Sequence, residues 1–218
     1  MNTSRLFSLI GVAAASLVMA GCATKPYNYT NFREHPPRSI LVLPPLNEST
    51  ELLGSYSYLS AVTQPLAEQG YYVFPVAIVD QFMKENGMPT AGEMHQVPLK
   101  KIYEILGADS VMYVTVLEYG TKFQILKSVP TVKAAARLVD TRTGILLWEG
   151  NVTVVQNSNN SGGGLIGALI VAVVEQAINT TTDRAHALCG QANVILFTSK
   201  DTGLLYGPYR PEEVSRAN

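Results

Sequence analysis

The chain has 218 residues, of which 47% are apolar and 15% are charged, and its 16 Lys and Arg nearly balance its 17 Asp and Glu. Ordinary soluble domains contain roughly 25% charged residues, so this composition excludes a disordered chain, an acidic tail and a surface that binds nucleic acid. The length allows one domain or two small ones, and two cysteines, Cys22 and Cys189, can form neither a disulfide framework nor, by themselves, a structural zinc site.

Residues 1–21 have the layout of a secretory signal peptide. Arg5 is the one ionisable side chain in this segment, and a mostly apolar run follows it from Leu6 to Ala20. The run has about 15 residues, whereas a helix needs roughly 20 to cross a bilayer, so a removable signal is favoured over a transmembrane anchor.

The segment Met19-Ala20-Gly21-Cys22 resembles the lipobox of bacterial lipoproteins, with Met19 where leucine is commonest. The resemblance implies that Cys22 becomes the first residue of the mature protein and carries three acyl chains such as palmitate. Two lipid signals already hold a protein stably on a bilayer, so three predict permanent anchoring. Ala23 follows in place of the Asp that retains such lipoproteins in the inner membrane, which implies the outer membrane and leaves its face open.

Residues 22–38 are interpreted as the lipidated cysteine and an extended tether. The segment contains Pro26, Pro36 and Pro37 together with the polar run 27–31. A flexible chain of this length would reach roughly 20 to 24 Å, so the domain could stand off the lipid. Residues 39–218 are expected to form a single α/β domain with a C-terminal helix and arm.

The first half of this domain predicts a βαβ unit. The apolar run 39–44 is typical of a strand buried on both faces. A helix is expected from Tyr56 to Gln69, with Gly70 as its stop and Pro65 as a local conflict that would kink or split it. The run 71–76 is the next strand, and a right-handed crossover would join the two.

The second half predicts two helices and three strands. The helices are expected at 78–86 and 99–106, each stopped by a glycine, with a loop at 88–98 between them. The strands are expected at 110–119, 131–139 and 145–155, and the turn Asp140 to Gly144 should make the last two antiparallel neighbours. The predicted fold is α/β, with helices packed on a mixed β-sheet.

A late helix is expected from Leu165 to about Ala187, after a polar and glycine-rich loop at 157–164. Its first half is apolar all round and too short to cross a bilayer, so it would be a core helix, a self-association interface, or a contact with a membrane or partner. The candidate interface residues are Leu165, Ile166, Leu169, Ile170, Val171, Val173 and Val174.

Few residues suggest catalysis. Helical spacing could bring Asp183, His186 and Cys189 near one face, but groups at i, i+3 and i+6 drift around a helix, and a lone cysteine is more often a small buried hydrophobe. His35 and His95 have no spacing that links them to this cluster, and the common hydrolase, zinc and phosphate-loop motifs are absent. We therefore predict no catalytic residue, no metal and no cofactor.

Eleven tyrosines, against one Trp and six Phe, are a further feature of the sequence. Tyrosine is favoured on half-buried contact surfaces, although these rings could equally pack against the loops of their own domain. The segment 203–209 has no regular period and is interpreted as an arm that lies on its own domain or on a neighbour.

Six segments of the chain carry a family resemblance: 27–33, 37–47, 65–73, 138–140, 144–148 and 203–208. Together they resemble small outer-membrane lipoproteins of Gram-negative bacteria, of unknown function, whose best-known member is a neisserial surface-antigen candidate. The resemblance implies a fold similar to the amino-terminal domain of TolB, together with self-association, and it transfers no active site.

These observations favour a lipid-anchored, non-enzymatic binding or assembly module in an envelope or export complex. The expected partners are the outer membrane through the lipid, a second copy of the chain, and an envelope protein. Two alternatives remain open: an enzyme that acts on cell-wall or lipid material, and a structural part of a secretion pore.

Overall fold

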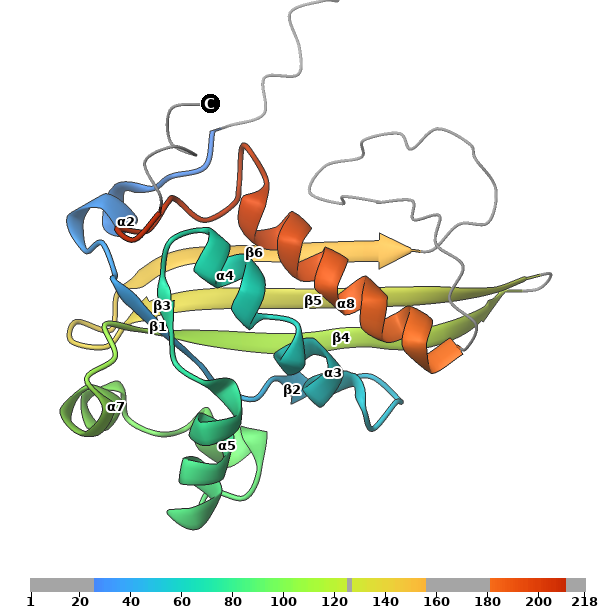
Figure 1. Cartoon of the computed structure of the whole chain (residues 1–218), viewed down its shortest axis with the longest axis horizontal. Coiled ribbons are helices and arrows are strands. Elements are labelled where there is room, and N and C mark those ends of the chain that lie inside the picture. The colour runs from blue at the N-terminus through green and yellow to red at the C-terminus, as the bar shows by residue number, and fades with distance from the viewer. Residues whose placement is uncertain (1–25, 125–126, 156–180, 211–218) are drawn as a thin grey trace, which may run out of the picture.

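The computed structural model describes residues 26–124, 127–155 and 181–210. Within these residues one sheet forms the centre of the molecule, with strand order β3-β1-β4-β5-β6 and with β2 also beside β4 (Figure 1). The strands are β1 (Ser39–Val42), β2 (Leu46–Asn47), β3 (Tyr72–Val73), β4 (Ser110–Gln124), β5 (Lys127–Asp140) and β6 (Leu146–Val155).

The sheet is mixed, as the sequence predicts. Strand β1 pairs in parallel with β3 and β4, whereas β4, β5 and β6 pair antiparallel. The turn between β5 and β6 is fixed by Asp140, whose Oδ1 accepts hydrogen bonds from the backbone N–H groups of Arg142 and Thr143. Gly144 follows with φ 73°, a conformation that favours glycine. Strands β4 and β5 are longer than predicted, at 15 and 14 residues.

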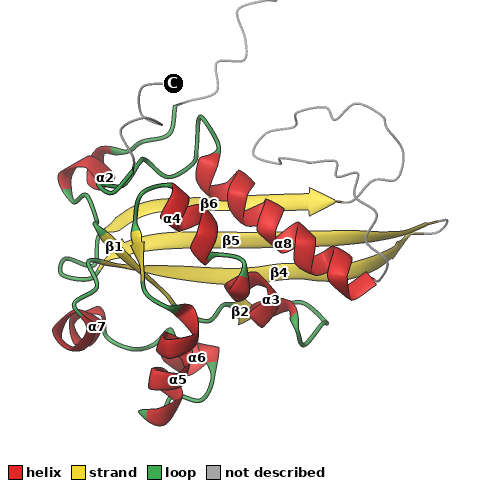
Figure 2. Ribbon diagram, viewed as in Figure 1, coloured by secondary structure: helices red, strands yellow, loops and turns green. Residues whose placement is uncertain are grey.

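Helices cover parts of both faces of the sheet (Figure 2). Helices α3, α4 and α8 lie over one face, and α5, α6 and α7 over the other. The described helices are α2 (Thr30–Glu34), α3 (Gly54–Ser60), α4 (Thr63–Glu68), α5 (Val76–Glu85), α6 (Ala91–Met94), α7 (Leu99–Leu106) and α8 (Thr181–Thr198).

Two local predictions need correction. The single helix at 56–69 is wrong, because the chain breaks at Ala61 and Val62 into α3 and α4. Pro65 then lies in the first turn of α4, where its missing N–H would have no helical partner. The loop at 88–98 contains the short helix α6, which begins with a capping box between Thr90 and Glu93.

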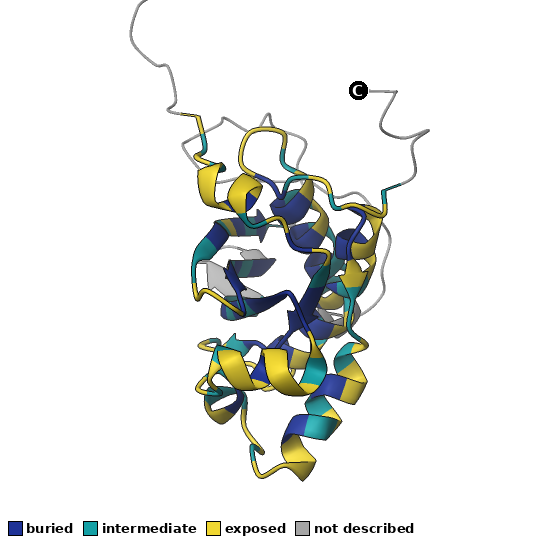
Figure 3. Cartoon of the chain, turned by 90° about the vertical axis from the view of Figure 1, so that its left-hand side faces the viewer, coloured by how far each residue is buried: buried dark blue, intermediate teal, exposed yellow. Residues whose placement is uncertain are grey.

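The core has two parts, one on each side of the sheet. Along β1, Ile40 and Val42 join the larger part under α3, α4 and α8, whereas Leu41 and Leu43 join the smaller part under α5 to α7. This strand is therefore buried on both faces, as its continuous apolar run predicts. Figure 3 shows the buried sheet at the centre and exposed helical surface above and below it.

The segment predicted as an extended tether is folded from residue 27 onward. Helix α2 packs Phe32 into the core, with 3% of that residue exposed. The Tyr29 hydroxyl donates to the Gly203 carbonyl oxygen at 2.5 Å, and the Glu149 N–H donates to the Tyr27 hydroxyl at 2.8 Å. The prediction of a tether through residue 38 is thus wrong, because a buried phenyl ring and these hydrogen bonds hold the segment on the domain.

The sequence predicts that the late helix ends near Ala187, and this is wrong: helix α8 continues to Thr198. Leu188, Ala192 and Leu196 recur every four residues and are buried against the sheet, which explains why the helix extends through Gly190. The apolar candidate interface at 165–174 lies outside the described residues.

The C-terminal arm lies on its own domain. The Tyr71 hydroxyl donates a hydrogen bond to the Leu205 carbonyl oxygen, and the N–H groups of Gly207 and Tyr209 donate to the carbonyl oxygens of Gln69 and Gly70. The arm therefore covers the end of α4 and the start of β3, which resolves the alternative between its own domain and a neighbour.

Candidate functional site

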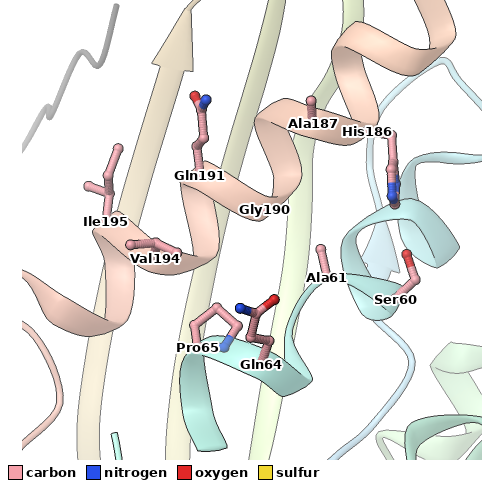
Figure 4. Close-up of a pocket in the computed structure, with 10 residues that line it drawn as sticks. All are labelled: Ser60, Ala61, Gln64, Pro65, His186, Ala187, Gly190, Gln191, Val194 and Ile195. Carbon is pink, nitrogen blue, oxygen red and sulfur yellow. The ribbon is translucent and has the colours of Figure 1, made fainter. Parts of the chain in front are cut away.

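A surface groove lies between α8 and the segment that contains the end of α3 and the start of α4. We call it the α4–α8 groove; its volume is about 600 Å³. Figure 4 shows its two walls meeting from opposite sides, with His186 of α8 pointing toward Ser60 and Val194 lying above Gln64 and Pro65. The lining residues are Ser60, Ala61, Gln64, Pro65, His186, Ala187, Gly190, Gln191, Val194 and Ile195.

Small side chains open the groove while buried contacts hold its walls. A Cβ added at Gly190 would meet no atom within 4 Å, so the missing side chain leaves open space. Beneath it, the buried Asn193 amide donates to the carbonyl oxygens of Cys189 at 3.0 Å and of Tyr58 at 3.4 Å. The first of these bonds lies within α8 and the second links α8 to α3, so a buried contact joins the two helices beside the groove.

The side chains that line the α4–α8 groove carry no permanent charge. None of the ten lining residues is Asp, Glu, Lys or Arg. Val194 is 44% exposed, and the amides of Gln64 and Gln191 add hydrogen-bonding groups beside this apolar surface. Such a lining suits a ligand that combines apolar groups with neutral hydrogen-bonding groups, as a polypeptide does.

The cluster suggested by helical spacing does not form a thiolate or metal site. Cys189 is fully buried, whereas His186 is exposed at the rim of the α4–α8 groove, so the thiol and the imidazole lie in different environments. Burial raises the pKa of the Cys189 thiol to about 12. Cys189 is therefore a small buried hydrophobe, in agreement with the simpler sequence interpretation.

This burial predicts low thiol reactivity. In a Cys22→Ala background, Cys189 should resist alkylation by iodoacetamide at pH 8 in the folded protein and react fully after denaturation. Because the folded pKa of about 12 lies above the unfolded value of 9.0, the unfolded thiol ionises first as pH rises. The free energy of unfolding should therefore fall between these two pH values, and less so in Cys189→Ala. Rapid alkylation of the folded protein would contradict this assignment.

Three aspartates of the domain have structural contacts. Asp109 accepts a hydrogen bond from the Arg38 N–H at 3.0 Å and so joins the starts of β1 and β4. Asp80 forms an ion pair with Lys84 at 2.7 Å along α5, and Asp140 fixes the β5–β6 turn. These contacts account for their positions without catalysis.

The three histidines do not come together as a site. His95 Nε2 lies 2.9 Å from the Pro44 carbonyl oxygen, and its pKa is lowered by burial, partly offset by that hydrogen bond. His35 caps α2, and His186 lies on α8. Across residues 26–124, 127–155 and 181–210, no group of three His, Cys, Asp or Glu residues is placed to hold a metal ion.

The tyrosines divide between core and surface. Tyr58 and Tyr71 are buried, and burial raises the pKa of both hydroxyls. Tyr72, Tyr206 and Tyr209 are among the exposed large side chains. The buried tyrosines pack within their own domain, and a contact role for the exposed ones stays a prediction.

Among the described helices, none combines the length and apolar character needed to span a membrane. The signal segment 1–21, Cys22 and the run 165–174 all lie outside the described residues. The structure therefore leaves lipidation and the candidate interface as predictions from the sequence.

Fold and groove together define the class of protein: a small α/β domain on a mixed sheet, with a neutral groove between surface helices. The family model described as "Putative lipoprotein GNA1162-like" matches residues 27–209, and the chain belongs to this family. A curated relative, "Putative lipoprotein NMB1124/NMB1162" of Neisseria meningitidis serogroup B, is 45% identical over 209 residues, covering 94% of this chain and 97% of the relative.

A solved structure of a close relative agrees with the fold. The crystal structure of lipoprotein GNA1162 from Neisseria meningitidis is 52% identical to this chain, with a TM-score of 0.53, over 58% of this chain and 88% of that one. A more distant likeness, at 17% identity and a TM-score of 0.39, is to the C-terminal domain of LpoB from Salmonella enterica, over 54% of this chain and 82% of that one. The family predicted from the sequence is confirmed, and so is the mixed α/β fold.

The α4–α8 groove is the feature that sequence reasoning missed. Its signal was present in the small residues Ala61, Ala187 and Gly190, which leave open space between two surface helices. The segments that carry Ala61 and Gly190 are far apart in the sequence, so no local pattern could pair them.

Proposed function

We propose that the protein is a non-enzymatic binding module, anchored to the outer membrane by lipid on Cys22, that holds a polypeptide segment of an envelope protein in the α4–α8 groove. Membership of a lipoprotein family and the lipobox-like segment ending at Cys22 support the anchoring. The neutral, partly apolar lining of the groove is the observation that carries the binding role.

The lining argues against other classes of ligand. A nucleic acid, a lipid phosphate or an acidic sugar would require cationic side chains, and the groove wall contains no Lys or Arg. A peptide instead supplies apolar side chains for Val194 and Ile195 and backbone groups for the exposed amide of Gln64, whose nitrogen also donates to the Glu68 carboxylate at 2.8 Å. Catalysis would need a nucleophile paired with a base, whereas the Ser60 hydroxyl donates to the Ser57 carbonyl oxygen at 2.9 Å.

Self-association through Leu165 to Val174 remains a second prediction, because this run lies outside the described residues. It is compatible with peptide binding in the groove. The face of the outer membrane on which the domain lies is also left to experiment.

The groove can be tested by photocrosslinking in intact cells. Benzoylphenylalanine at Val194 should give one discrete protein adduct, and Gly190→Leu should abolish it, because the leucine side chain would occupy the open space at Gly190. Gly190→Ala is the matched control: it leaves most of the groove open, should keep the adduct, and should raise the free energy of unfolding by about 0.5–1 kcal/mol. The same probe at Lys101 on α7, far from the groove, should not give that adduct.

Two outcomes would contradict the proposal. One is the absence of any adduct at Val194 while the protein is present at its normal level. The other is an adduct that persists at full yield in Gly190→Leu, which would mean that the captured protein does not enter the groove.

A further inference from the structure

The N-terminal segment is attached to one end of the domain by contacts from several elements. Beyond the bonds of Tyr27 and Tyr29, the Asn31 amide donates to the Leu146 carbonyl oxygen at 3.0 Å, and Phe32 is buried. On the domain, these bonds are made by Leu146 and Glu149 in β6 and by Gly203 in the loop that follows α8. Pro26 therefore has a fixed place at this end of the molecule.

This place limits how far the domain can lie from its lipid. Between Cys22 and Pro26 there are three intervening residues, and four extended steps of the backbone span at most about 14 Å. If residues 23–38 were all flexible, the reach would instead be roughly 20 to 24 Å. Since the acyl chains enter the hydrocarbon, Pro26 must lie within or just above the headgroup layer.

The same end of the domain carries exposed tyrosines. We call it the anchor end: residues 26–35, the loop 199–203 and the arm 204–210, which lie together at the top of both Figure 1 and Figure 3. Tyr206 and Tyr209 are 55% and 61% exposed, and the rings of Tyr27 and Tyr29 lie 4.6 Å apart. The Arg210 guanidinium lies 3.3 Å from the centre of the Tyr206 ring.

These side chains suit the boundary between water and lipid. Tyrosine is enriched at membrane interfaces because one part of the ring is apolar and the hydroxyl is polar. Charge is nearly balanced here, with Arg33, Lys200 and Arg210 against Glu34 and Asp201, a net formal charge of +1. Contact with the bilayer would thus depend on the acyl anchor and the aromatic rings rather than on anionic lipids.

From this geometry we infer that the domain lies directly on the bilayer with its anchor end against the lipid headgroups, and that α5, α6 and α7 point away from the membrane. The inference rests on the proposed lipidation of Cys22. The short span from Cys22 and the multiple contacts of residues 27–32 act together: the first sets the distance, and the second sets the orientation. The partner at the anchor end is then the lipid headgroup layer.

Quenching by spin-labelled lipids tests this orientation in the full, lipidated protein. In a Cys189→Ala background, a single thiol-reactive fluorophore is attached at Lys200→Cys in the anchor end or at Glu85→Cys at the end of α5, both exposed positions. The proteins are bound to phosphatidylcholine vesicles that contain phosphatidylcholine with a nitroxide on its headgroup. The label at residue 200 should be quenched several-fold more strongly than the label at residue 85.

The outcomes separate the orientation from the anchor. Equal quenching at the two positions, in protein that floats with the vesicles, would overturn the orientation and leave lipid anchoring intact. Protein that lacks acyl chains by mass spectrometry and does not float would overturn both. Circular dichroism of each labelled protein confirms that the exposed cysteine has not changed the fold.

Discussion

Trp148→Ala is expected to lower the free energy of unfolding by about 3–5 kcal/mol, because it removes a large fully buried side chain and leaves a cavity. Trp148 lies on β6 with 0% of its surface exposed, and its ring centre is 5.9 Å from that of Phe197 on α8. Its Nε1–H donates to the Thr202 carbonyl oxygen at 2.8 Å. One residue thus connects the sheet, α8 and the loop of the anchor end.

Two variants separate the contributions of Trp148. Trp148→Phe keeps an aromatic ring but leaves the Thr202 carbonyl without this donor, so we expect a smaller loss of about 1–3 kcal/mol. Gly150→Ala should also destabilise, because its Cβ would lie 2.6 Å from the Trp148 ring. Chemical denaturation measures all three changes. A loss below about 1 kcal/mol in Trp148→Ala would show that the surroundings collapse into the space or that the ring is not part of the core.

Cys22→Ala is expected to abolish acylation completely. The thiol is the atom that receives the diacylglyceryl group in proteins with a lipobox, and alanine offers no nucleophile. Metabolic labelling with radioactive palmitate should therefore mark the native protein but not Cys22→Ala. Each buried methylene contributes about 0.8 kcal/mol to membrane binding, so loss of three chains removes the stable anchor.

Cys189→Ala is the matched control for this experiment. The second cysteine is fully buried in the folded domain, and its replacement should leave palmitate incorporation unchanged. Equal labelling of Cys22→Ala and the native protein would contradict the lipobox interpretation. It would also remove the basis for the proposed orientation on the membrane.

Local signals predicted much of the fold. The helix at 99–106 has the bounds that its sequence predicts, because Gly107 adopts the left-handed conformation that ends a helix. The turn from Asp140 to Gly144 set the antiparallel pairing of β5 and β6 through contacts between near neighbours. The predictions were wrong where contacts with a distant segment determine the structure. Helix α8 extends to Thr198 because its inner face is buried against the sheet, although Gly190 interrupts the helical sequence pattern.

The site was less predictable than the fold. Sequence spacing grouped His186 with Cys189, but His186 is exposed at the groove and Cys189 is buried in the core. The groove itself needs α4 and α8, which are more than a hundred residues apart in the chain. Neither wall carries a charge or motif that would identify it before the two are brought together.

By itself, the sequence determined the family and the mixed α/β class, and it predicts a signal segment and lipidation at Cys22, because each depends on a linear motif or on local periodicity. Only the tertiary structure decided that residues 27–38 belong to the domain, that the C-terminal arm folds back on it, and that a neutral groove opens beside α8. These features depend on contacts between segments distant in the sequence, such as Tyr29 with Gly203 and Tyr71 with Leu205. Such contacts form only when the packed core fixes the positions of both partners. Neither segment therefore shows a periodic pattern of residues from which the contact could be predicted.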